Sequence, residues 1–271
     1  MIVQSAPPGE RRHAVIAQLE HTRFAGELAR HWGNGVFAPL APRELMLHLV
    51  AHHDDGWDIV DAAIGQDPDT GLPYNLVRTP IPAIVKSGSR GPDLNEAHHP
   101  YCGLLSSMHT YGLYHGRYGL SDKVFVNVIP PEHRPAVDDV SAREQGRQER
   151  LRARLAADPE AAPWVEELAL FHNYKLLQLF DTLALYFNCT HEAARGVSTF
   201  ANVPRRLGDD ITLTVSRIEA GVYRVEPFPF AEEETVVECR HRWLEPQPPG
   251  TSMPEALASA PEGIERMRLV S

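Results

Sequence analysis

Residues 52–57 read His-His-Asp-Asp-Gly-Trp and follow an apolar segment whose residues have helical spacing. This spacing places His53 on the same helical face as Met46 and Leu49, so its imidazole is predicted to point into the interior. Burying the carboxylate of Asp54 beside it is costly unless something compensates the charge. A divalent metal ion is the commonest compensation for a His and an Asp together. The run therefore predicts a metalloenzyme, whose fold must bring further ligands to this point.

The size and charge of the chain set limits on its partners. Its 271 residues, 43% of them hydrophobic, can bury one large core, or one core with a small appendage. The formal net charge of −10 argues against a nucleic-acid backbone as the main partner. A small polar or anionic metabolite is compatible with this charge, because the local field of a cleft can oppose the net charge of the protein. We therefore expect a small-molecule partner.

The sequence predicts a cytoplasmic protein with no membrane partner. No apolar stretch reaches the roughly 18 residues that a membrane span needs. Residues 1–8 lack the basic start and the apolar run of a signal peptide. The three cysteines are far apart and odd in number, which favours a reducing compartment without a disulfide framework.

Most of the chain has the apolar periodicity of helices. The predicted helices cover residues 10–32, about 42–55, about 99–115 and about 162–188, and a solvated helix or hairpin is predicted at residues 139–158. Residues 63–93 are rich in Pro, Gly and Asp and are predicted to be a long loop. Loops of this length in compact domains are usually functional or mobile.

After Ser198 the pattern changes to short alternating segments. Three antiparallel strands are predicted, at residues 211–215, 222–225 and 235–239. Because so small a sheet is unstable by itself, we expect it to pack on the helices. The predicted fold is mainly α, with three parts: a helical metal-binding domain at residues 10–198, a small strand segment at 199–245, and a loop with a short helix at 246–271.

Four further residues could complete a metal site with His53 and Asp54. His21 lies on the apolar stripe of the first helix, and the third helix carries His99 at its start and His109 further along. Asp181 lies on an apolar face of the last helix, where an unpaired carboxylate would be unfavourable. Its position is explained if it closes a metal site that distant helices assemble.

These residues, in their order along the chain, resemble the HD-domain superfamily: His21, His53-Asp54, His99, His109 and Asp181. Members of that superfamily are metal-dependent helical proteins, mostly phosphohydrolases and phosphodiesterases, with a minority of oxygenases. Residues 53–56 resemble its HD-x-G signature, with Trp57 where Lys often follows. The segment from His99 to Gly103 is similar to part of the HD-GYP phosphodiesterases, in which that His binds a second metal.

Within the superfamily, the chain most resembles an uncharacterised bacterial family that has three sequence motifs. These are an HDDGW signature, a Thr-Gly-x-Pro loop and a C-terminal Pro-Phe strand segment. Residues 70–73 and 229–230 fit the second and third motifs. The resemblance covers most of residues 10–240. It implies an HD-type helical bundle.

The resemblance also implies two metal ions. One would be held by His21, His53, Asp54 and Asp181. Asp54 would bridge to the second ion, which is held also by His99 and His109. Four imidazoles and two carboxylates suit iron, manganese or zinc better than magnesium or calcium. We expect iron, with manganese and zinc as alternatives.

Other interpretations of the same residues stay open. His21 could be a hydrogen-bonded core histidine, and Asp181 could be a helix-capping or Arg-paired carboxylate. The ligands of the second ion could be replaced by their neighbours His98 and His115. If neither predicted ligand of the second ion binds, the site is mononuclear.

Three more residues are predicted to act in catalysis. Asp55 could orient a ligand histidine or hydrogen-bond the substrate, or it could simply end its helix. Lys86 and Arg90, on the predicted long loop, could bind an anionic group, or they could be solvated.

Two chemistries use such ligands. In a hydrolase, the metals would lower the pKa of a bound water and polarise a phosphoryl oxygen. In an oxygenase, which would resemble myo-inositol oxygenase and related phosphonate oxygenases, both metals are iron and a C–C or C–P bond is cleaved. Residues 44–77 contain no Lys or Arg, although phosphoryl transfer benefits from nearby cations. The sequence therefore favours the oxygenase, with a phosphohydrolase or phosphodiesterase as the alternative and a non-catalytic metal or ligand sensor as a third hypothesis.

Overall fold

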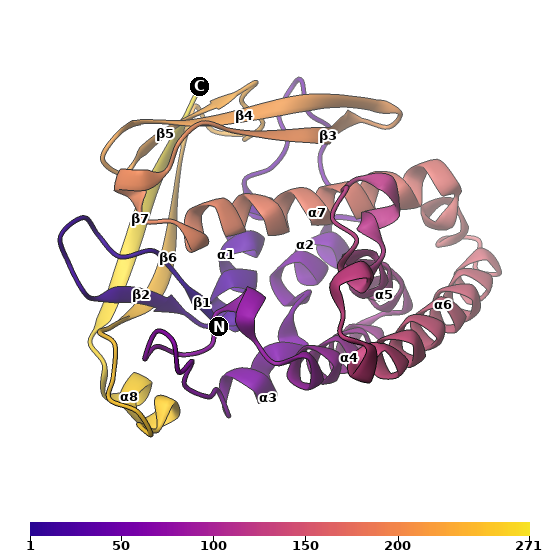
Figure 1. Cartoon of the computed structure of the whole chain (residues 1–271). Coiled ribbons are helices and arrows are strands. Elements are labelled where there is room, and N and C mark those ends of the chain that lie inside the picture. The colour runs from indigo at the N-terminus through magenta and orange to yellow at the C-terminus, as the bar shows by residue number, and fades with distance from the viewer.

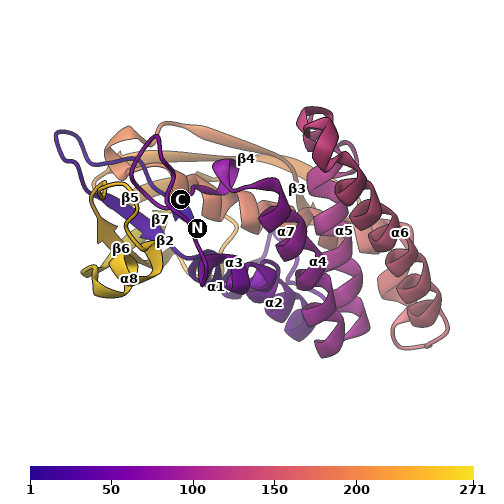
Figure 2. The ribbon, with the colours of Figure 1, turned by 60° about the horizontal axis from the view of Figure 1, so that its bottom comes forward.

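A computed structural model describes all 271 residues. Helices form one side of the molecule and a single sheet forms the other, with both chain termini on the sheet side (Figures 1 and 2). The α-helices are α1 Gln18–Arg30, α2 Arg43–His52, α3 Asp58–Asp61, α4 Ile81–His98, α5 Pro100–Tyr114, α6 Arg134–Ala156, α7 Glu167–Cys189 and α8 Met253–Ser259. Short 3-10 helices connect them, among them η1 Asp55–Trp57, η2 Leu76–Arg78, η3 Gly116–Gly119 and η4 Phe125–Val128. No helix combines the length and the apolar character that crossing a membrane would need.

Helix α7 is the central helix of the molecule. Its buried residues recur along its length, from Leu170 to Asn188. It packs against α1, α2 and α5 and also against strand β3 (Ser198–Arg206), and Figure 1 shows it between the sheet and the other helices. Asp181 lies on this helix and is 4% exposed. Helix α7 therefore carries a carboxylate into the core.

Seven strands form one mixed sheet, in the order β1-β2-β6-β7-β5-β4-β3. Besides β3, the strands are β1 Ile2–Val3, β2 His13–Ile16, β4 Asp209–Glu219, β5 Val222–Glu226, β6 Glu234–Leu244 and β7 Glu262–Val270. Neighbouring strands are antiparallel except for β5 and β7, which are parallel.

The prediction of a mainly α fold with a small strand appendage was wrong. The expected short helix after residue 246 is present as α8, but it is followed by strand β7, which lies inside the sheet between β6 and β5. Met267 and Leu269 of β7 are fully buried. This strand was missed because only Met267 and Leu269 supply apolar side chains to its buried face, and Glu265 and Arg266 interrupt the alternation before them. Its pairing with β6 stabilises so weak a pattern as a strand.

The predicted helix at residues 10–32 begins later, at Gln18. Residues His13–Ile16 form strand β2 instead, and they pair with β6. So short an apolar segment fits the period of a helix or of a strand, and its pairing partner decides between them. The predicted helices at about 42–55, 99–115 and 162–188 are confirmed as α2, α5 and α7, with their ends shifted by a few residues.

The predicted long loop at residues 63–93 contains most of helix α4. A Cβ atom at Gly56 would overlap backbone atoms of Ser87 and Gly91 on this helix. The turn that follows His53-Asp54 therefore contacts the α4 backbone directly. Gly91, one of the glycines that favoured a loop in the sequence, lies at this close approach between two helical segments.

One hydrophobic core joins the helices to the sheet. It combines side chains of α1, α5 and α7 with side chains of β4, β6 and β7, including Phe24, Leu105, Phe180, Val215, Val237 and Met267. Because the helices and the sheet pack their apolar faces against each other, the sheet contributes directly to the packing of α7.

The central position of β7 can be tested by mutation. Leu269→Ala should lower the free energy of unfolding by about 2–5 kcal/mol, because it leaves a cavity under a fully buried strand position. Ile264→Ala, on the same strand but 56% exposed, should change it by less than about 1 kcal/mol. Urea unfolding followed by circular dichroism measures both values. Equally small effects in the two variants would contradict a central β7.

Candidate metal centre

Five of the six residues predicted to bind metal lie together in the interior. They come from α1, the turn after α2, α5 and α7. Two groups have all of their ligand atoms within 4.8 Å of one another: His21, His53 and Asp181, and His53, Asp54 and His109. His53 belongs to both groups, so it is the centre of the cluster formed by these five residues.

The backbone orients the imidazole of His53. Its Nδ1 lies 2.8 Å from the carbonyl oxygen of Val50, so Nδ1–H donates to that oxygen and Nε2 keeps its lone pair. Nε2 has no hydrogen-bond partner, although the side chain is fully buried. It lies 3.8 Å from Oδ1 of Asp181 and 3.9 Å from Oδ2 of Asp54. A buried lone pair that faces two carboxylates fits a metal ion.

His21 faces the same carboxylate from α1. Its Nδ1 lies 2.9 Å from Oδ1 of Asn188, and its Nε2 lies 3.3 Å from Oδ1 of Asp181. When Nδ1–H donates to Asn188, Nε2 presents its lone pair to Asp181. A cation between these two ligand atoms would stabilise that arrangement.

His109 approaches the cluster from α5. Its Nδ1 lies 3.0 Å from the side-chain amide of Gln178, and its Nε2 lies 3.9 Å from Oδ1 of Asp54. Asp54 therefore directs one oxygen toward His53 and the other toward His109. The side chain of Asp54 is 16% exposed, whereas both histidines are buried, so Asp54 is the ligand that solvent reaches.

The charges in the cluster depend on one another. In the absence of a metal ion, burial disfavours the charged form of His53, but attraction to Asp54 and Asp181 outweighs it and raises the pKa of His53 to about 9. A metal ion at Nε2 would therefore displace a proton and leave the imidazole neutral. Burial lowers the pKa of His109 to about 4. Burial also favours the neutral form of Asp181, but in the absence of a metal ion its interactions with the imidazoles of His21 and His53 outweigh burial. These Nε2 atoms lie 3.3 and 3.8 Å from Oδ1, and they hold the pKa of Asp181 well below its usual range. The cluster thus keeps Asp181 ionised, as metal binding requires.

Arg117 contacts the second oxygen of Asp181. Its Nη2 lies 3.3 Å from Oδ2. It belongs to a left-handed turn in which every residue from Gly116 to Gly119 has a positive φ, including 51° at Arg117 and 55° at Tyr118. Non-glycine residues are strained there, and such strain is often found at functional sites. The sequence analysis missed Arg117, and its two flanking glycines are the only local signal of this turn.

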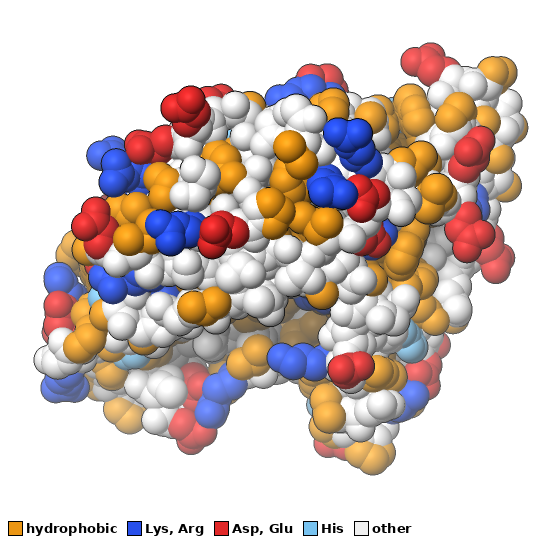
Figure 3. All heavy atoms as spheres, turned by 90° about the horizontal axis from the view of Figure 1, so that it is seen from above, with side chains coloured by type: hydrophobic (Ala, Val, Ile, Leu, Met, Phe, Trp, Pro, Cys, Tyr) orange, Lys and Arg blue, Asp and Glu red, His pale blue; other side chains and the backbone are white.

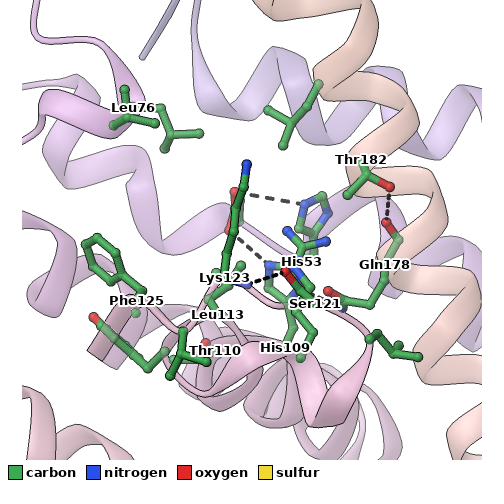
Figure 4. Close-up of a pocket in the computed structure, with 18 of the residues that line it drawn as sticks. His53, Leu76, His109, Thr110, Leu113, Ser121, Lys123, Phe125, Gln178 and Thr182 are labelled. Atoms are coloured by element: carbon green, nitrogen blue, oxygen red, sulfur yellow. Dashed lines mark hydrogen bonds and ion pairs between the residues drawn. The ribbon is translucent and has the colours of Figure 1, made fainter. Parts of the chain in front are cut away.

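Three residues of the cluster reach the wall of a pocket with a volume of about 1060 Å³. His53, Asp54 and His109 share its wall with three cationic residues, Arg117, Lys123 and Lys175, of which Lys175 is paired with Asp210. Figure 4 shows Lys123 pointing into the pocket beside His53 and His109. The space-filling view shows a hollow beside the sheet, with basic and hydrophobic side chains at its rim (Figure 3).

The model of a protein family described as "Protein of unknown function (DUF3891)" matches residues 1–246. The chain belongs to this family. The matched residues contain the whole cluster and every residue that lines the pocket. No curated protein and no solved structure matches the chain. The resemblance to the HD-domain superfamily stays a prediction, which rests on the residues of the cluster.

The structure does not bring His99 to the cluster. His99 precedes α5, and its Nδ1 accepts a hydrogen bond from the backbone N–H of Tyr101. It lies ten residues before His109, which corresponds to roughly 15 Å along a helix. The second ion implied by the resemblance would therefore lack one of its predicted ligands.

The neighbours of the predicted second-ion ligands do not replace them. His98 is exposed, and its ring stacks on that of His48 with the ring centres 3.4 Å apart. His115 lies past the end of α5, where its Nε2 is 2.9 Å from Oγ of Ser141. Neither belongs to a group that could hold a metal with the cluster.

The three predicted catalytic residues lie outside the pocket. Oδ2 of Asp55 is 2.8 Å from Nδ1 of His52. Arg90 donates two hydrogen bonds, of 3.0 and 2.9 Å, to the carboxylate of Asp58. Lys86 is exposed on α4. Because residues 81–98 form a helix, the small residues of α4 face the pocket and its cations face away.

Removing a ligand of the cluster should remove the metal. His53→Ala and Asp54→Ala should each lower the metal content of purified protein at least about tenfold, because both are predicted to contact the ion directly. His99→Ala is the matched control and should keep the metal content of the unaltered protein. Plasma mass spectrometry measures the content, and circular dichroism checks that each variant is folded. Equal loss in His99→Ala and His53→Ala would restore His99 to the site.

Proposed function

We propose that this protein is a metal-dependent hydrolase of small phosphate esters. The pocket supports this most directly, because Arg117 and Lys123 lie along the same walls as the cluster. Phosphoryl transfer benefits from fixed cations near the charge that develops on the transferred group. In a protein with a net charge of −10, cations gathered at one pocket indicate an anionic substrate.

The metal would be held by His21, His53, Asp54 and Asp181, with His109 beside them. When bound, it would lower the pKa of a water molecule and polarise a phosphoryl oxygen. This set of imidazoles and carboxylates suits zinc, manganese or iron. One ion for each chain is the stoichiometry that the described ligands support best.

Other residues of the pocket can position the water molecule and the phosphate group. The carboxylate of Asp54, which solvent reaches, can accept a hydrogen bond from the attacking water. Arg117 and Lys123 can bind the phosphate oxygens. The oxygen of water then bonds to phosphorus while the ester P–O bond breaks. The ester oxygen keeps the electron pair and gains a proton, so that one water molecule yields inorganic phosphate and an alcohol.

The iron-dependent oxygenase has less support from this geometry. The absence of Lys and Arg from residues 44–77 favours it in the sequence, but the fold supplies cations to the pocket from Arg117 and Lys123. It also needs a second ion, for which His99 is not in place. The oxygenase and the non-catalytic sensor are therefore alternatives that experiment must separate from the hydrolase.

The hydrolase hypothesis can be tested on protein purified without oxygen and then loaded with metal. It should release phosphate from p-nitrophenyl phosphate. Arg117→Ala and Lys123→Ala should each lower kcat/KM about 10- to 100-fold, because a hydrogen bond to a charged group is worth about 1.5–3 kcal/mol. Lys86→Ala removes an exposed lysine outside the pocket and should leave kcat/KM unchanged.

Metal analysis and Mössbauer spectroscopy on the same preparation separate the alternatives. Two coupled irons for each chain, with oxygen consumption and no phosphate release, would refute the hydrolase and favour the oxygenase. Binding of phosphate esters without any product would instead favour a sensor.

A further inference from the structure

The cluster takes up only one side of the pocket. The volume of about 1060 Å³ is at the upper end of the roughly 300–1,000 Å³ that is usual for sites of drug-sized ligands. Figure 4 shows His53 and His109 on one side and Leu76 and Phe125 on the other, with Lys123 between them. A phosphate group bound at the cluster would leave the second side for the rest of the substrate.

This second side is apolar. Leu76, Val77, Phe125 and Val128 all line the pocket there, on the short helices η2 and η4. Val77 is 85% exposed and Val128 is 71% exposed. Apolar side chains that remain in contact with water in a pocket favour a ligand that covers them with apolar surface.

The charges of the pocket suit a single phosphoryl group. Of its three Lys and Arg side chains, Arg117 is paired with Asp181 and Lys175 with Asp210. Lys123 is the one that forms no ion pair, and the carboxylate of Asp122 lines the pocket next to it. One unpaired cation, an Arg117 whose charge is shared with Asp181, and a nearby acidic residue favour a monophosphate over a diphosphate or triphosphate.

Of the hydroxyl groups that line the pocket, those of Ser87 and Thr182 are already used within the protein, whereas Tyr114 Oη has no hydrogen-bond partner. Ser87 Oγ donates to the carbonyl oxygen of Ile84 at 2.9 Å, and Thr182 Oγ1 donates to that of Gln178 at 2.7 Å. Their donor hydrogens are therefore not free for the hydroxyl groups of a sugar.

From these observations we infer that the substrate is a phosphate monoester of a phenol or of a branched aliphatic alcohol. This inference rests on the proposed function. The phosphate lies between the cluster and Lys123, and the apolar group packs against Leu76 and Phe125. Hydrolysis then releases inorganic phosphate and the phenol or alcohol, by the bond changes given above.

Calorimetric titration with phosphonates measures binding apart from turnover. Phenylphosphonate should bind metal-loaded protein at least about tenfold more tightly than methylphosphonate, because the phenyl group adds apolar contact. Phe125→Ala and Val77→Asn should each weaken phenylphosphonate binding about fivefold or more and leave methylphosphonate binding unchanged. Val197→Asn is the matched control, since Val197 is 72% exposed and does not line the pocket.

Hydrolysis of 1-naphthyl phosphate and glycerol phosphate by the same protein completes the test. Equal affinity for the two phosphonates, or tighter binding of pyrophosphate than of phenylphosphonate, would overturn the inferred substrate class. Equal rates with the two esters would also overturn it while leaving the hydrolase intact. Selective binding of phenylphosphonate that depends on Phe125, with no release of phosphate from either ester, would support the apolar ligand class and refute the hydrolase.

Discussion

The buried carboxylate of Asp181 is the charge around which the helical half of the molecule is arranged. Helix α7 carries it into the core, where an unpaired carboxylate would be strongly unfavourable. His21, His53 and Arg117 approach its oxygens at 3.3, 3.8 and 3.3 Å. These three come from α1, the turn after α2 and the turn after α5. Three distant parts of the chain therefore pack against α7 with a side chain directed at the same carboxylate.

Two local features of the backbone allow this arrangement. The missing Cβ of Gly56 lets the turn after His53-Asp54 contact helix α4. The left-handed turn from Gly116 to Gly119 places Arg117 beside Asp181, and the chain continues from it to Lys123 in the pocket. One close approach and one strained turn thus lie where the cluster meets the pocket, and backbone strain is common at functional sites.

The sheet takes part in the site as well as in the core. Residues 199–202 of β3 line the pocket, and β3 packs on the helix that carries Asp181. The pocket therefore lies where the two layers meet, with the cluster on one side and apolar side chains on the other (Figure 4). This division of polar and apolar surface is the basis of both the proposed hydrolase and the inferred substrate class.

The sequence by itself determined which side chains share a helical face, and therefore which titratable residues are forced into apolar surroundings. Together with the resemblance to the HD-domain superfamily, that local information named five residues that the structure brings together: His21, His53, Asp54, His109 and Asp181. Only the tertiary structure decided that His99 lies apart, that Arg117 and Lys123 reach the pocket, and that β7 pairs inside the sheet. Helical periodicity depends on neighbours three and four residues away, and it can be read from the sequence. The distance of a side chain from other helices, the direction of a left-handed turn and the partner of a strand depend on contacts between residues far apart in the chain, which no local pattern records.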